Sequence, residues 1–213
     1  MPRPLNVLLP LFLLLSLLLG IAPWDRATWA LENAMTALFA VFLFFQQRRQ
    51  PLSAAAWWLI FAFGALHITG AHYTYSRVPY NEWTQAAFGS SLNAALGWER
   101  NHFDRLVHFA YGLLLFLPVR ETLAERTGLD GAAASYFSVE FVMASSLLYE
   151  LIEWGAAVTF GGELGMAYLG TQGDIWDAHK DMALASAGAL LAWGIRALWR
   201  RSARAAVAVI ARD

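Results

Sequence analysis

Six apolar segments, each long enough to cross a lipid bilayer as a helix, constrain this chain more than any other feature. A helix needs roughly 20 mostly apolar residues to cross about 30 Å of hydrocarbon. Hydrophobic residues make up 58% of the chain and charged residues 15%, whereas soluble domains carry about 25% charged residues. The sequence therefore predicts an all-α polytopic membrane protein, a single integral membrane domain over residues 1–213. Its six transmembrane helices are expected at about 5–22, 27–46, 54–73, 103–120, 132–159 and 177–199.

The first apolar segment has two interpretations. Arg3 before it and the small residues Gly20 and Ala22 at its end are typical of a cleaved signal peptide. The apolar run is long for a signal peptide, however, and Pro23 follows the expected cleavage point. These two features favour a retained transmembrane helix.

The distribution of Lys and Arg predicts the orientation, because these residues accumulate in cytoplasmic loops. With a cytoplasmic N-terminus, ten of the 15 cations lie inside: Arg3, Arg48, Arg49, Arg120, Arg126, Arg196, Arg200, Arg201, Arg204 and Arg212. Three lie in outer loops (Arg26, Arg77 and Arg100), and Arg105 and Lys180 lie at the outer mouths of spans. We therefore expect a multi-pass membrane protein with both termini in the cytoplasm.

Charge and composition exclude several function classes. A net charge of −1 without a basic face argues against a nucleic-acid partner. Because the chain has no cysteine, it has no disulfides, thiolate metal sites or thiol nucleophiles. Neither a phosphate-binding loop nor a dinucleotide fingerprint is present. Membrane lipids are the expected surroundings, and the sequence does not predict an oligomeric state.

Ionisable side chains gather towards the predicted outer ends of the spans. Such groups are costly inside a membrane and commonly mark functional sites. The outer group comprises Glu32, His67, His72, Asp104, His108, Glu150, Glu153, Asp177, Lys180 and Asp181. Glu140 lies near the inner end of its span, and we expect it to reach the cytoplasmic interface without a functional role.

Helical spacing predicts that these groups form a cup. Residues three or four apart share a helix face, which pairs Asp104 with His108 and Glu150 with Glu153. The same spacing places Asp177, Lys180 and Asp181 together on the last span. A structural alternative is open for the first pair, since an Asp–His hydrogen bond would merely orient its helix.

The cup carries more negative than positive charge. Six carboxylates (Asp104, Glu150, Glu153, Asp174, Asp177 and Asp181) face three cations (Arg100, Arg105 and Lys180), although Asp174 is also a suitable helix cap. Protonation or a bound divalent cation would balance the excess. Zinc, iron or manganese suits mixed histidine and carboxylate ligands, and magnesium is possible with fewer histidines. The predicted metal ligands are Asp104, His108, Glu150, Asp177, Asp181 and His72.

The leading functional hypothesis is a metal-dependent hydrolase or transferase that acts on a lipid-linked or envelope substrate. Glu153 is the predicted general base or acid, and Lys180 and Arg105 would bind the negative charge of an anionic substrate. Two alternatives are a small proton- or ion-coupled transporter and a non-catalytic membrane factor in which ion pairs fix helix packing.

Four stretches of the sequence resemble the uncharacterised bacterial inner-membrane family typified by YjdF. They are HITGAHYTYSRVP (67–79), RNHFDRLVH (100–108), YELIEW (149–154) and GTQGDIWDAHKD (170–181). The resemblance implies a multi-pass protein of the bacterial inner (plasma) membrane and brings no established activity. A more distant similarity is to VanZ-like proteins, in whose pattern Gln and Asn stand where this chain has Glu153 and Asp181.

Overall fold

In the part of the chain that the structure describes, all the regular secondary structure is helical. The structure is a computed structural model that describes residues 4–210, without the side chains of residues 163, 164, 167 and 204–210. It confirms the predicted all-α class. The helices are α1 (Leu5–Gly20), α2 (Arg26–Arg49), α3 (Ala54–His72), α4 (Tyr80–Phe88), α5 (Leu92–Leu96), α6 (Phe103–Thr127), α7 (Gly131–Phe160), α8 (Gly162–Leu169) and α9 (Asp177–Ile210).

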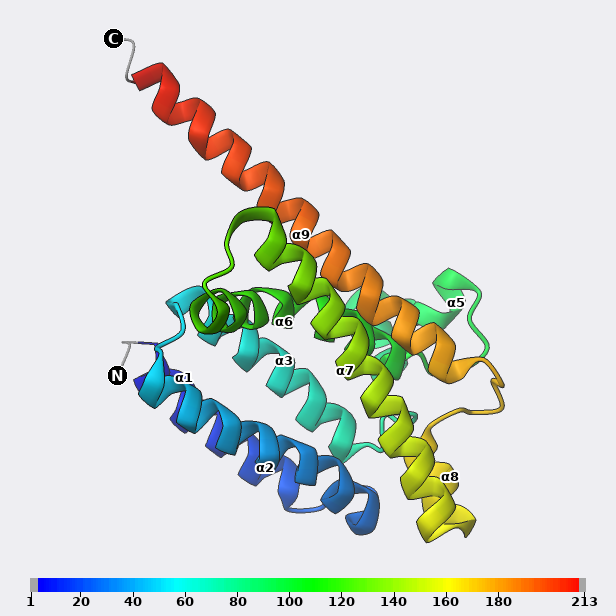
Figure 1. Cartoon of the computed structure of the whole chain (residues 1–213). Helices are drawn as coiled ribbons and strands as arrows, with labels where there is room; N and C mark the ends of the chain where they lie inside the picture. Colours follow the sequence, from blue (N-terminus) through cyan, green and yellow to red (C-terminus); the bar gives the residue numbers. More distant parts are fainter. Residues whose placement is uncertain (1–3, 211–213) are drawn as a thin grey trace.

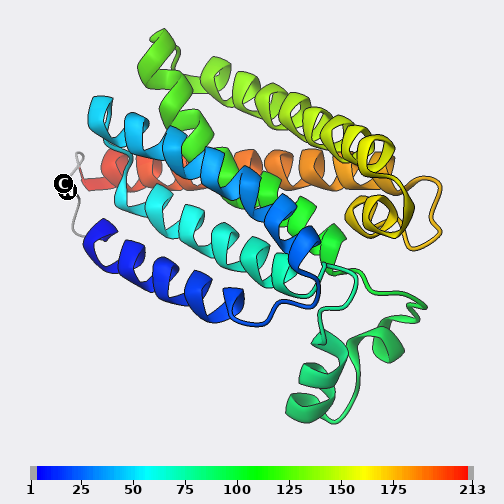
Figure 2. The same cartoon turned by 90° about the horizontal axis from the view of Figure 1, so that it is seen from below.

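Five of these helices (α2, α3, α6, α7 and α9) are long and apolar enough to cross a membrane. Helix α1 has 16 residues, or about 24 Å at 1.5 Å per residue, and runs beside α3 (Figure 2). Together they form the predicted bundle of six. Helices α6 and α9 continue well beyond their predicted ends, because charged helix-forming residues such as those at 120–126 extend a helix past the apolar stretch that hydropathy detects.

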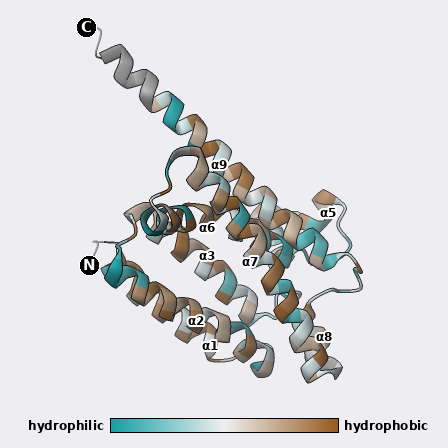
Figure 3. Cartoon of the chain, in the orientation of Figure 1, coloured by the Kyte–Doolittle hydropathy of each residue, from teal (hydrophilic) through white to brown (hydrophobic). Residues whose placement is uncertain are grey.

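The first residues of helix α1 pack into the bundle core. Leu5 and Leu8 are buried in a cluster with Leu52, Ala56 and Trp57 at the start of α3. That the first apolar segment is a retained helix stays a prediction. Brown apolar residues cover much of the bundle in Figure 3, as expected of a surface that faces lipid.

Helices α6 and α9 approach each other closely in the middle of the bundle. A Cβ atom built on Gly112 of α6 would collide with the carbonyl oxygen of Ala185, and one on Gly188 of α9 would collide with that of Phe109. Phe116 and Ala189 pack beside this crossing. Small residues permit such backbone contact between membrane helices, and the contact fixes α9 against α6.

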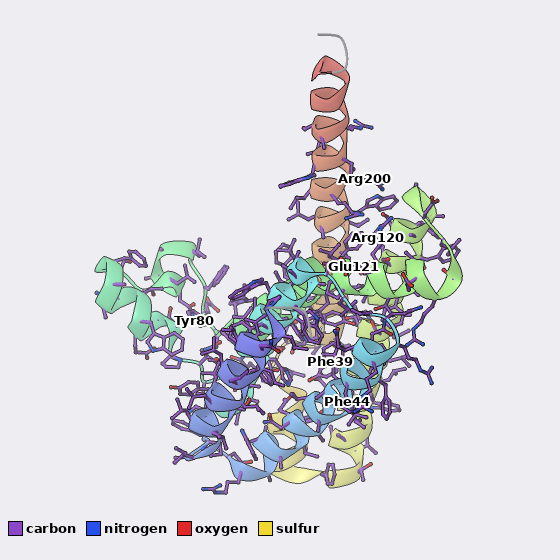
Figure 4. All side chains as sticks on the ribbon, turned by 90° about the vertical axis from the view of Figure 1, so that its left-hand side faces the viewer. Phe39, Phe44, Tyr80, Arg120, Glu121 and Arg200 are labelled. Atoms are coloured by element: carbon purple, nitrogen blue, oxygen red, sulfur yellow. The ribbon has the colours of Figure 1, made fainter. Side chains whose placement is uncertain are left out.

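The bundle has two different ends. Helix α1 begins and α9 finishes at one end, called here the terminal end, and α4, α5 and α8 lie at the opposite end, called the site end (Figures 1 and 2). Arg120 and Arg200 lie near each other at the terminal end (Figure 4). The cytoplasmic location of the terminal end stays a prediction. Of the cations that support it, Arg3, Arg212 and the side chain of Arg204 lie outside the described residues.

The two long connections at the site end contain short helices. Within the connection 74–102, helices α4 and α5 form an arm that extends away from the bundle (Figure 2), and Tyr80 lies at the start of this arm (Figure 4). Tyr80 donates a hydrogen bond to the Asn93 side chain (2.7 Å), which closes the arm. Trp83 and Phe88 are exposed on it. Helix α8 occupies the glycine-rich connection between α7 and α9.

Candidate metal centre

Side chains from three helices meet at the site end of the bundle. One ligand atom each from Asp104, His108 and Asp181 lies within 4.8 Å of the other two. His108 Nε2 is 3.6 Å from Asp104 Oδ1 and 3.7 Å from Glu150 Oε1. Helix α6 thus supplies Asp104 and His108, α7 supplies Glu150 and α9 supplies Asp181. These four residues are called the acidic site below.

The acidic site contains buried oxygen atoms that nothing in the described chain satisfies. Glu150 is 8% exposed and Asp181 is 2% exposed. Glu150 Oε1 and Asp181 Oδ1 have no hydrogen-bond partner among the described residues. Buried polar atoms nearly always have partners in folded proteins, and a buried carboxylate without one is especially costly. These two oxygens are therefore candidate ligands for a cation.

The distances from His108 are too long for hydrogen bonds and close to those between two ligands of one metal ion. The distances of 3.6 and 3.7 Å from His108 Nε2 exceed the normal length of a hydrogen bond. Zinc binds histidine nitrogen and carboxylate oxygen at about 2.0–2.2 Å, so two ligands at a tetrahedral ion are roughly 3.3–3.6 Å apart. The donor set of Asp104, His108 and Asp181, one imidazole and two carboxylates with Glu150 beside the imidazole, also suits iron or manganese.

Local sequence explains how α6 presents its two ligands. Asn101 Oδ1 accepts a hydrogen bond from the Phe103 backbone N–H (2.9 Å), which satisfies a free donor at the start of the helix. Asp104 then lies in the first turn and His108 one turn later. The close crossing at Gly112 and Gly188 positions Asp181 of α9 opposite them.

A second group of acids and tyrosines lies next to the acidic site. Tyr149 donates a hydrogen bond to Glu32 Oε2 (3.1 Å), and Glu32 and Glu153 are 3% and 9% exposed. With Asp104, Tyr75 and Tyr168, these two glutamates line a cavity with a volume of about 10 Å³. That volume is about the minimum that holds one water molecule. Glu153 therefore lies beside both a ligand of the acidic site and a water-sized cavity.

Tyr75 reaches this cavity through an unusual backbone. Thr74 and Tyr75 both have φ of +52°, which is sterically costly for residues with a Cβ and recurs at functional sites. The turn folds Tyr75 back onto α3, where its hydroxyl lies 2.5 Å from His67 Nδ1. Only glycine fits at position 70, because a Cβ there would lie 2.7 Å from the Tyr75 ring.

The tyrosines of this second group were given no role from the sequence. Glu32 was predicted only to lie towards the outer end of its span. A role for Glu32 could have been predicted, because Glu32 is the acidic residue of its span and lies towards the same end of the bundle as the other acids. The tyrosines had no comparable signal, because aromatic residues near span ends are common in membrane proteins.

The segment 170–176, called the strap below, is held over the site by three cations. Arg100 donates to the Thr171 carbonyl oxygen (2.5 Å) and to Asp177 (2.6 Å). Arg105 binds Asp174, and Lys180 Nζ lies 2.6 Å from the same carboxylate. Hydrogen bonds from Lys180 and from the Trp176 backbone N–H hold the pKa of Asp174 well below its usual range. The Trp176 N–H precedes α9, so its bond to Asp174 closes a turn within the strap and is not the predicted helix cap.

Two predicted metal ligands, Asp177 and His72, bind partners outside the acidic site. Asp177 is buried, but its carboxylate is bound by Arg100. His72 Nδ1 is 2.7 Å from the Leu19 carbonyl oxygen, so this side chain joins α3 to the end of α1. The structure does not bring His72 together with Asp104, His108 and Asp181, and we omit it from the ligand set. The five-residue spacing from His67 does not favour a shared helix face.

Comparison with known proteins agrees with this architecture. A protein family described as "Predicted membrane protein (DUF2238)" matches residues 4–202. "Inner membrane protein YjdF" of Escherichia coli (strain K12) is 36% identical over 190 residues, which cover 89% of this chain and 87% of that protein. No solved structure matches the chain. The more distant similarity to VanZ-like proteins stays a prediction.

Proposed function

Because the chain belongs to the DUF2238 family and is an integral protein of the bacterial inner membrane, we propose a function for its acidic site within the bilayer. The site binds one divalent metal ion and uses it in a hydrolysis or transfer reaction on an anionic, lipid-linked or envelope substrate. The supporting observation is the pair of buried, unpartnered oxygens of Glu150 and Asp181 beside the His108 ring.

The proposed metal ligands are Asp104, His108, Glu150 and Asp181. A bound divalent ion would polarise a phosphoryl oxygen of the substrate and acidify a water molecule. Two ionised carboxylates would balance the charge of such an ion, and the third can stay protonated; the imidazole would favour zinc, iron or manganese over calcium.

Glu153 is the proposed general base. It lies in the wall of the water-sized cavity that Asp104 also lines, so its carboxylate can accept a proton from a water molecule held there. Arg105 and Lys180 are the proposed contacts for the substrate's negative charge. Both bind Asp174 of the strap, and an anionic group at this position would compete with that carboxylate.

A proton- or ion-coupled transporter has less support. The carboxylates of the site lie at one end of the bundle, and the middle of α6, α7 and α9 is filled by Phe116, Val139, Val142, Ala185 and Ala189. A path for protons or ions would need polar groups through this apolar core.

The proposed reaction can be tested with purified protein and two probes, a short-chain phosphatidic acid and a polyprenyl diphosphate. We expect phosphate release from at least one probe, stimulated by manganese or zinc and abolished by a chelator. Replacing Glu153 with glutamine should lower turnover about 10²–10⁴-fold, the usual contribution of a general base, and leave the bound metal in place. His108→Ala should lose both metal and turnover. Full turnover by Glu153→Gln, or in the presence of chelator, would contradict the proposal.

A further inference from the structure

An apolar groove lies between α7 and α9, two helices that lie side by side in Figures 1 and 2. Its volume is about 370 Å³, which is within the range of about 300–1,000 Å³ that is typical of small-molecule sites. It is lined by Glu140, Met143, Ala144, Leu147, Met182, Ala183 and Ser186.

The groove lies next to the acidic site along both helices. Leu147 at one end of its lining is three residues from Glu150 on α7, about 4.5 Å along the helix axis. On α9, Met182 of the lining directly follows Asp181. A molecule that lies in the groove would therefore have one end beside two of the proposed metal ligands.

The chemistry of the lining favours a flexible hydrocarbon. Met143 and Leu147 are 44% and 46% exposed on the lipid-facing side, and Ala144 and Ala183 leave room between the two helices. Methionine adapts its shape to flexible apolar partners. Glu140, the charged residue of the lining, lies about 10 Å along α7 from Leu147 and bounds the apolar part of the groove at the end away from the acidic site.

We infer that this groove holds one hydrocarbon chain of a lipid whose phosphate headgroup reaches the acidic site. The inference rests on the proposed function and makes it more specific, because it names a lipid phosphomonoester as the substrate class and the bilayer as the side of entry. The headgroup phosphate would contact the metal, and the first segment of the chain would lie against Leu147 and Met182.

The test uses phosphatidic acid that carries a photoactivatable group on one acyl chain, added to the purified metal-bound protein in phosphatidylcholine nanodiscs. After irradiation, mass spectrometry locates the labelled peptides. We expect labels on the groove segments 140–147 and 182–186. Unlabelled phosphatidic acid should compete at least about tenfold better than phosphatidylcholine with the same chains, a difference of about 1.4 kcal/mol.

Two tryptophan variants provide a matched comparison. Ala144→Trp fills the groove and should reduce groove labelling at least about tenfold without changing the metal content, whereas Leu148→Trp, at an exposed position of α7 outside the lining, should leave labelling unchanged. Equal competition by the two lipids, or labelling unaffected by Ala144→Trp, would overturn the inference even when the protein contains its metal. Absence of metal from the wild-type protein would instead refute the proposed function.

Discussion

Replacing Gly112 with alanine is expected to destabilise the protein by about 3 kcal/mol and to remove its metal binding. The added methyl group would collide with the Ala185 carbonyl oxygen, and neither helix backbone can rotate away as a side chain could. Overpacking usually costs about 1–3 kcal/mol, and contact with backbone places this case at the upper limit. Separation of α6 from α9 would also move Asp104 and His108 away from Asp181. Thermal unfolding in detergent and metal analysis measure the two effects.

Two other glycine substitutions serve as controls for this prediction. A Cβ atom at Gly194 of α9 or Gly155 of α7 meets no atom within 4 Å. Alanine at either position should leave stability unchanged or raise it by up to about 1 kcal/mol, because alanine is the better helix former. Equal stability of Gly112→Ala and Gly194→Ala would show that the α6–α9 contact is not as close as described.

The second large effect is expected for Asp181→Asn, which should stabilise the metal-free protein while abolishing stabilisation by metal. Asp181 is 2% exposed and lies near the charges of Asp104 and Asp177. Asparagine has nearly the same shape as aspartate but no charge, so it does not repel the neighbouring carboxylates and can donate hydrogen bonds to them. Relief of an unsatisfied buried charge is worth about 1–3 kcal/mol, or several degrees in Tm for a chain of this length.

The same substitution removes a ligand in the metal-bound protein. At a metal concentration about 1,000 times the Kd, the wild-type protein should gain about 4 kcal/mol, whereas Asp181→Asn should gain almost nothing. Asp174→Asn is the matched control, because Asp174 is bound by Arg105 and Lys180. It should lower the Tm without reducing the metal-induced shift. A lower Tm for metal-free Asp181→Asn would indicate that Asp181 serves only to hold the fold together.

Much of the architecture could be predicted because the bilayer restricts the possible structures. In hydrocarbon every backbone N–H and C=O group must be hydrogen-bonded within the protein, so apolar segments of sufficient length predict helices. Because successive helices alternate in direction, six of them bring both ends of the chain to one end of the bundle. The same alternation places Asp104, Glu150 and Asp181 at the opposite end. Helical spacing then predicts which side chains share a face.

The contacts between helices could not be predicted in this way. Spacing along one helix does not determine which helix faces it, so the association of Glu32 with Tyr149 on α7 was not foreseen. The pairing of His72 with the end of α1 depends on how α1 and α3 pack. The close crossing of α6 and α9 depends on two glycines that, in sequence, resemble any others in a membrane helix.

The metal content of the purified protein tests the central claim most directly. Elemental analysis of the wild-type protein should find one divalent ion per chain, and His108→Ala should contain none while retaining its helical content. His179→Ala removes the same side chain from an exposed position on α9 and should keep the ion. A wild-type protein that neither contains a divalent ion nor takes one up after purification would contradict the account.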